Sequence, residues 1–81
     1  MPSPIKRKRV LNALKQMENE GEVYIFHGGR HLKVVAIKEG AGSFPIPVSH
    51  PEVSAFILKA FRMWMKENGI RGVEHIEKLL R

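Results

Sequence analysis

The apolar positions in residues 5–21 are spaced as on one side of an α-helix. They recur three to four residues apart, at Val10, Leu11, Leu14 and Met17. Gly21 follows at the expected end of the helix, because glycine readily adopts the left-handed conformation that terminates many helices. The pattern predicts an amphipathic helix in this segment.

Three β-like segments come next, separated by turn residues. Residues 22–26 and residues 31–38 are rich in β-forming side chains and flank the pair Gly28-Gly29, which is typical of a hairpin. A second turn, "EGAGS", leads into the extended piece "FPIPV". Its two prolines lack an N–H donor, so this piece is predicted to be an edge strand or a strand end.

A second long helix is predicted after residue 48. Ser49 and Glu52 have the spacing of a capping box, and Pro51 falls in the first turn, where its missing N–H costs nothing. The stripe expected to face the core consists of Val53, Phe56, Ile57, Ala60, Phe61 and Trp64. Gly69 ends the helix, and the helical spacing of apolar residues in 72–81 predicts a short final helix.

The predicted fold class is α+β, in the order α-β-β-β-α with a short C-terminal helix. A three-stranded antiparallel sheet is packed by two helices on one face. The 81 residues make a single domain, with a core of about 6–70 and the C-terminal helix at about 72–81. No apolar run reaches the ~20 residues that span a bilayer. The start does not resemble a signal peptide, so a cytoplasmic protein is expected.

Charge narrows the choice of partner. The chain carries 14 Lys and Arg against 8 acidic residues, all of them Glu, for a net charge of +6. Residues 1–38 hold eight of the basic residues and three of the acidic ones. This imbalance favours a polyanionic partner, with nucleic acid first, over a merely solubilising basic surface.

Two groups of cations are candidates for holding phosphate. The first, here called the N-terminal cationic row, consists of Lys6, Arg7, Lys8 and Arg9. These cations precede the positive end of a helix macrodipole, where selection for stability alone would favour acids and where a phosphate binds well. The second group consists of Arg30 and Lys33 in the hairpin. The cations of the second helix, Lys59, Arg62 and Lys66, are expected on a solvated side opposite Phe56 and Phe61.

His31 is the candidate catalytic residue. Strand alternation places His31 and Lys33 on one face and Leu32 and Val34 on the other, which is expected to pack on the helices. An imidazole with an ordinary pKa of ~6.5 exchanges protons near neutrality, and adjacent cations stabilise a phosphorane, so RNA cleavage without a metal is feasible. His27 lies across a Gly-Gly turn from His31, with no Asp or Cys nearby. No metal and no cofactor is therefore expected.

The chain also resembles a known family, the HicA toxins (YcfA-like), which are small mRNA interferases of toxin–antitoxin systems. The resemblance covers residues 6–70 and rests on the glycine-terminated first helix, on "GGRH" at the start of the second strand and on "IPVSHPEV" before the long helix. It implies a fold like that of a double-stranded-RNA-binding domain, an mRNA substrate and a HicB-like antitoxin partner. The family's catalytic histidine follows Gly-Ser or Gly-Thr, and that role falls here on His31. Arg30 replaces the usual Ser or Thr, and Leu32 replaces a frequent second histidine.

Three functions from different classes follow. The first is a metal-independent endoribonuclease toxin in which His31 is the general acid/base, Arg30 and Lys33 hold the scissile phosphate, and the N-terminal cationic row follows the RNA backbone. The second is a non-catalytic RNA-binding module on the same fold. The third is a protein-interaction domain that uses Val35, Ile37 and the C-terminal segment as an interface, unless that segment covers the sheet within one chain. The free protein is expected to be a monomer or a weak dimer.

Overall fold

The computed structural model describes residues 3–21, 23–28, 31–36, 40 and 42–81. The elements follow in the order β1 (Ile5–Lys6), α1 (Arg7–Asn19), β2 (Val23–Gly28), β3 (His31–Ala36), β4 (Ser43–Pro47), β5 (Glu52–Val53), α2 (Ala55–Glu67) and α3 (Val73–Leu79). The expected α+β order of one helix, three antiparallel strands, a second helix and a short C-terminal helix is confirmed. No helix in these described ranges is long and apolar enough to cross a bilayer.

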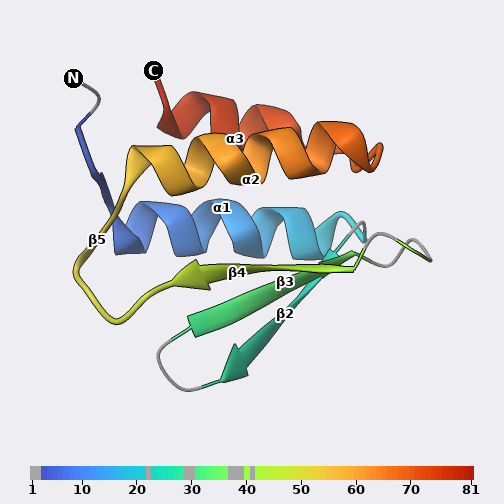
Figure 1. The fold of residues 1–81 in the computed structure, drawn as a ribbon, viewed down its shortest axis with the longest axis horizontal. Coiled ribbons are helices and arrows are strands. Elements are labelled where there is room, and N and C mark those ends of the chain that lie inside the picture. Colours follow the sequence, from blue (N-terminus) through green and yellow to red (C-terminus); the bar gives the residue numbers. More distant parts are fainter. Residues whose placement is uncertain (1–2, 22, 29–30, 37–39, 41) are drawn as a thin grey trace.

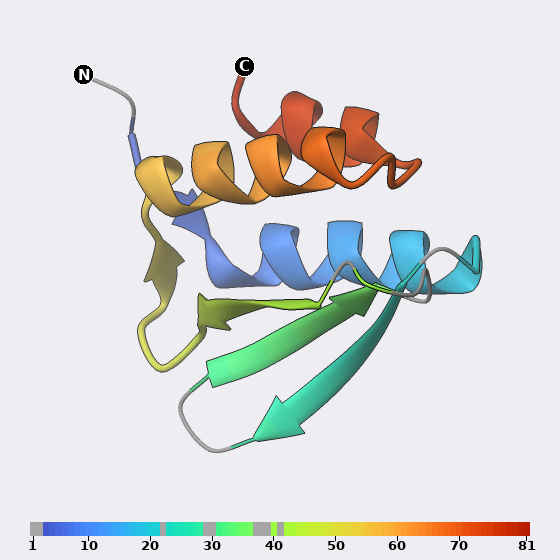
Figure 2. The same ribbon diagram turned by 45° about the vertical axis from the view of Figure 1, so that its right-hand side comes forward.

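The helices form one layer and the sheet β2-β3-β4 forms the other (Figure 1). Helix α1 packs against β2, α2 packs against β4, and α3 packs against both of these helices. The rotated view in Figure 2 shows the same arrangement, with all three helices on one side of the sheet. The alternative in which the C-terminal segment covers the other side of the sheet is therefore wrong.

A single hydrophobic core lies between the two layers. Its fully buried side chains come from both long helices, the sheet and α3, and the largest are Phe61, Leu14, Met17, Leu32, Ile46, Leu58, Met65 and Ile76. The rings of Phe44, Phe61 and Trp64 pack together with centroid separations of 5.2 to 5.8 Å. Ile76 and Leu79 belong to this core, so α3 is an integral part of the domain.

The start of α2 differs from the sequence prediction. The helix begins at Ala55, and the hydroxyl oxygen of Ser54 accepts a hydrogen bond of 3.2 Å from the backbone N–H of Phe56. The capping box predicted at Ser49 and Glu52 is therefore wrong. Glu52 and Val53 instead pair with Lys6 and Ile5 in the short antiparallel ladder β1-β5. Burial of Ile5 and Val53 in the core favours the ladder, so the helix starts later.

The core-facing side of α2 also differs from the predicted stripe. Phe56 is 69% exposed and Ala60 is exposed, whereas Leu58 and Met65 are fully buried. Lys59 lies on the same side as Phe56, with its Nζ atom 5.8 Å from the ring centroid, so the predicted opposite placement is wrong. Apolar residues surround most of this helix, and periodicity alone does not select the side that packs on β4.

Some backbone donors are absent or already bonded at each outer edge of the sheet. β4 is an edge strand, as its prolines predict, and Pro45 and Pro47 leave two of its positions without an N–H. At the other edge, the Glu18 carboxylate accepts a hydrogen bond of 2.8 Å from the N–H of Ile25 in β2. These features oppose the addition of a further strand, because an edge must offer a row of free donors and acceptors to recruit one.

Candidate functional site on the open sheet face

The sheet face that carries no helix is built from alternate residues of the three strands. Cross-strand partners share a face, and the register pairs Phe26 with Lys33 and Pro45, and Gly28 with His31 and Pro47. The described side chains of this open face are Tyr24, Phe26, His31, Lys33, Ser43, Pro45 and Pro47. None of these is acidic, so the face combines aromatic, cationic and imidazole groups without a counter-charge of its own.

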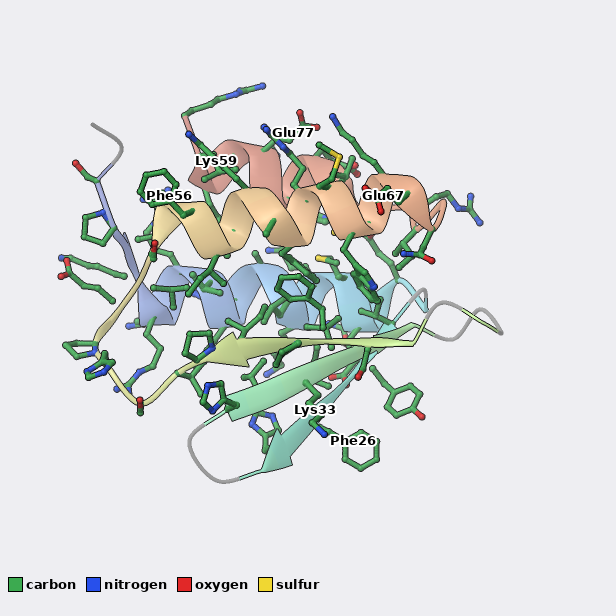
Figure 3. The ribbon with its side chains drawn as sticks, viewed as in Figure 1. Phe26, Lys33, Phe56, Lys59, Glu67 and Glu77 are labelled. Carbon is green, nitrogen blue, oxygen red and sulfur yellow. The ribbon has the colours of Figure 1, made fainter. Side chains whose placement is uncertain are left out.

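His31 and Lys33 lie where the sequence predicted them. Both are exposed, whereas Leu32 and Val34, between and beyond them on β3, are 1% and 0% exposed and face the helices. Figure 3 shows Lys33 beside Phe26, both projecting from the sheet on the side opposite the helices. The predicted pairing of an imidazole and an ammonium group on one uncovered face is therefore confirmed.

Glycine at position 28 leaves open space next to His31. A hollow of about 410 Å³ lies there, lined by Phe26, His27, Gly28, His31 and Lys33. A Cβ atom at Gly28 would have only the backbone oxygen of His31 near it, at 4.0 Å. A ligand can therefore approach the imidazole from the β2 side. This access follows from the register, which places a glycine, with no side chain, opposite His31.

A second hollow meets His31 from the β4 side. It measures about 420 Å³, and its lining includes His31, Pro47 and Phe56. The hollow extends from the sheet to the first turn of α2, past the edge strand. His31 thus borders two hollows, one toward β2 and one toward α2. A ligand that fills both would contact residues on either side of the imidazole.

Tyr24 and Phe26 are functional candidates that the sequence analysis did not identify. They are 44% and 57% exposed, and their ring centroids are 5.5 Å apart with the planes tilted by 55°. The signal was present in the alternation of β2, because Val23 is buried and Ile25 half-buried on the helix side. The sequence analysis treated residues 22–26 as one apolar run and did not separate the two faces.

The N-terminal cationic row is exposed, and Arg7 ties it to the end of the sheet. The backbone N–H of Arg7 donates to the carbonyl of Pro51 at 2.9 Å, and its guanidinium Nη1 donates to the carbonyl of Val48 at 3.0 Å. Val48 follows Pro47, the strand partner of His31. The structure therefore brings Arg7 to the same end of the molecule as His31.

The row does not act as one surface, however. Lys6, Arg7 and Lys8 line a hollow of about 590 Å³ together with Pro51 and other residues of that end of the molecule. Arg9 instead lines a separate hollow between α1 and α3, with His75 and Lys78. Arg7, Lys8 and Arg9 are successive residues of α1 and point in directions about 100° apart, so they cannot share one side. Arg30, the remaining predicted phosphate-binding residue, lies outside the described residues.

Within the described ranges, one group of three side chains could hold a metal ion, and it is remote from the open face. Glu20, Glu74 and His75 place their ligand atoms within 4.8 Å of one another. His75 Nε2 lies 2.8 Å from Glu20 Oε2, an ion pair or hydrogen bond that joins the end of α1 to α3. That contact explains why Glu20 and His75 lie close together, because it links the end of α1 to α3.

No protein-family model, curated protein or solved structure matches this chain. The functional argument therefore depends on the residues of the open face and on the cations at the His31 end of the molecule.

Proposed function

We propose that the protein is a metal-independent endoribonuclease, an mRNA interferase toxin of a toxin–antitoxin pair, with His31 as its general acid/base. One observation carries the proposal. An exposed imidazole and an exposed ammonium group lie two residues apart on an uncovered sheet face, beside a hollow that Gly28 keeps open. The described side chains of that face include no carboxylate that would repel a phosphate.

The chemistry needs only groups that this face supplies. The neutral imidazole of His31 removes the proton of a ribose 2′-OH, and the resulting oxygen attacks the adjacent phosphorus. Lys33 stabilises the negative charge that develops on the phosphorane. The P–O5′ bond breaks, and the leaving 5′-oxygen takes up a proton from water. The products are a 2′,3′-cyclic phosphate and a 5′-hydroxyl.

The cations at the same end of the molecule are proposed to hold the RNA backbone outside the reacting phosphate. Lys6, Arg7 and Lys8 are exposed there, and the contacts of Arg7 with Val48 and Pro51 give this group a fixed place relative to His31. Arg9 points toward α3 and is expected to contribute less. Arg30 is proposed as a second phosphate-binding residue because it precedes His31 in the motif that resembles the HicA toxins.

The same resemblance supplies the proposed biological setting. The α-β-β-β-α order agrees with the fold that the resemblance implies, and His31 occupies the position of that family's catalytic histidine. The proposal accordingly includes mRNA as substrate, the cytoplasm as location and a HicB-like antitoxin as partner. The free protein is proposed to be a monomer or weak dimer, which agrees with the two prolines in the edge strand β4 and with the hydrogen bond of Glu18 to Ile25 at the β2 edge.

A second candidate is a non-catalytic RNA-binding module on the same fold. The presence of Arg30 in place of a small hydroxyl residue favours it. A guanidinium binds phosphate, but it stays protonated and so supplies neither a nucleophile nor a base. This module would bind RNA with an affinity that falls steeply with salt, and it would leave the RNA intact.

Cleavage in the presence of a chelator separates these two functions. Purified protein incubated with unpaired RNA and excess EDTA is expected to release fragments that end in a 2′,3′-cyclic phosphate and begin with a 5′-hydroxyl. Mass spectrometry of the fragments identifies both ends. Salt-sensitive binding with intact RNA would instead establish the non-catalytic module.

Gly28→Val is expected to lower cleavage without unfolding the domain. Gly28 has no positive φ and lies on a β-strand, so a β-branched side chain fits its backbone conformation. The added methyl groups would occupy the hollow beside His31 and displace the substrate, and a displacement of ~1 Å can cost on the order of 10²-fold in rate. Ser43→Val, on the same face but at the far end of β4, is the matched control and should cleave normally. Equal cleavage rates for Gly28→Val and Ser43→Val would show that the RNA does not enter the hollow beside His31.

A further inference from the structure

We infer that the open face binds unpaired RNA by stacking bases on Tyr24 and Phe26, which makes single-stranded rather than duplex RNA the substrate class. This inference rests on the proposed function, because the bases that it places on Tyr24 and Phe26 belong to nucleotides next to the one that is cut at His31. It adds a binding surface that includes two residues with no assigned role in the chemistry. The two rings, Lys33 and His31 form one continuous strip across β2 and β3.

The exposure of the two rings is the first argument. Tyr24 and Phe26 are the large apolar side chains of the open face, and about half of each remains in contact with solvent. Their positions alternate with the buried Val23 and the half-buried Ile25, which pack on the core, so the fold does not need the rings for its core. Bases stack on such exposed aromatic rings at sheet surfaces with little regard to sequence.

Charge complementarity is the second argument. Lys33 is the direct cross-strand partner of Phe26, so an ammonium group lies beside the ring. A nucleotide whose base stacks on Phe26 thereby has a cation available for its phosphate. The labelled carboxylates Glu67 and Glu77 in Figure 3 lie in the helical layer, on the other side of the molecule. An anionic, base-bearing chain fits this face better than an acidic peptide, because every nucleotide carries both a phosphate and a planar ring, whereas the acidic side chains of a peptide carry no ring.

The geometry distinguishes unpaired from paired RNA. In an A-form duplex the base faces are covered by their neighbours, and only the backbone and the groove edges are accessible. The two tilted rings can then make no stacking contact, and a duplex loses the part of the binding energy that the rings supply to a single strand. In a single strand the bases can unstack and lie on the rings. The strip would therefore hold an unpaired segment with one of its phosphates near His31.

The test measures binding rather than cleavage, with His31→Ala as the parent protein so that the RNA survives. Fluorescence anisotropy is recorded with a short single-stranded RNA, with the same RNA annealed to its complement, and with a strand in which several bases are replaced by abasic sites. The single strand is expected to bind best. Tyr24→Leu and Phe26→Leu are each expected to weaken its binding roughly 5- to 150-fold, the usual range for loss of one stacked base. Leucine keeps the apolar character of each site and limits any effect on folding.

A matched control uses Met63→Leu, since Met63 is 55% exposed, close to the 57% of Phe26, but lies on α2. Its binding should equal that of the parent. Equal binding of abasic and normal strands, or no loss in Tyr24→Leu and Phe26→Leu, would overturn the inference. Those results are also expected if a partner protein covers the face instead.

The outcomes for the two proposals are separable. Protein that binds unpaired RNA through Tyr24 and Phe26 but never cuts it supports the stacking surface and refutes the nuclease. Protein that cuts RNA normally after both substitutions supports the nuclease and refutes the stacking surface.

Discussion

His31→Ala is expected to lower the rate of RNA cleavage by about 10²- to 10⁴-fold, the usual contribution of a positioned general acid/base. The side chain is exposed at the start of β3, and its removal leaves the core untouched. Circular dichroism and thermal unfolding of the variant should therefore match those of the wild type. RNA binding should change little, because the rings and cations of the open face remain.

His27→Ala is the matched control for that substitution. His27 is also exposed and belongs to the same hairpin, but its register partner is Leu32, so its side chain is directed to the opposite face of the sheet. His27 also borders the hollow beside His31. Because its side chain points away from the open face, cleavage by this variant should stay far closer to the wild-type rate than cleavage by His31→Ala. Loss of cleavage in His27→Ala with full activity in His31→Ala would refute the assignment of the catalytic histidine.

Phe61→Ala is expected to be the most damaging single substitution for stability. Phe61 is 0% exposed and lies 5.2 Å from the ring of Phe44 and 5.7 Å from that of Trp64, measured between centroids. Truncation of a buried phenylalanine costs about 3–5 kcal/mol, whereas domains of this size have a total unfolding free energy of ~5–15 kcal/mol. Urea denaturation should show a midpoint moved far toward zero denaturant, or an unfolded protein.

Phe56→Ala provides the matched control on the same helix. Phe56 is 69% exposed, and it makes a cation–π contact with the exposed Lys59 that is worth about 0.5–1 kcal/mol. The free energy of unfolding should fall by no more than that amount. The sequence pattern placed both phenylalanines in one core stripe, so equal losses for the two variants would favour the pattern and contradict the structure.

The order of the elements could be predicted from the sequence because it depends on local signals. The helical spacing in residues 5–21, the Gly-Gly turn and the paired prolines each act within a few residues. The start of α2 depends instead on the pairing of Ile5 with Val53, which are far apart in the chain. The side of α2 that packs on β4 likewise depends on tertiary contacts, because Phe56, Leu58 and Phe61 are comparably apolar.

The candidate site was partly predictable for the same reason. The two-residue period of β3 separates His31 and Lys33 from Leu32 and Val34 without knowledge of the fold. The same period in β2 separates Tyr24 and Phe26 from Val23 and Ile25, but only the register of β2 against β3 shows that the rings share a face with Lys33 and His31. The division of the N-terminal cationic row required the position of α3, which lies next to Arg9.

The central claim is that His31 activates a ribose 2′-OH on the open face, and a single substitution in the RNA tests it most directly. Two unpaired oligonucleotides that differ only by a 2′-deoxy sugar at the cleaved nucleotide are incubated with an excess of wild-type protein and EDTA. His31→Ala protein purified in parallel excludes a contaminating nuclease. We expect the wild type to cut only the all-ribose strand at that position and the variant to cut neither. Cleavage of both strands, no cleavage of either, or equal cleavage by the variant would contradict the account.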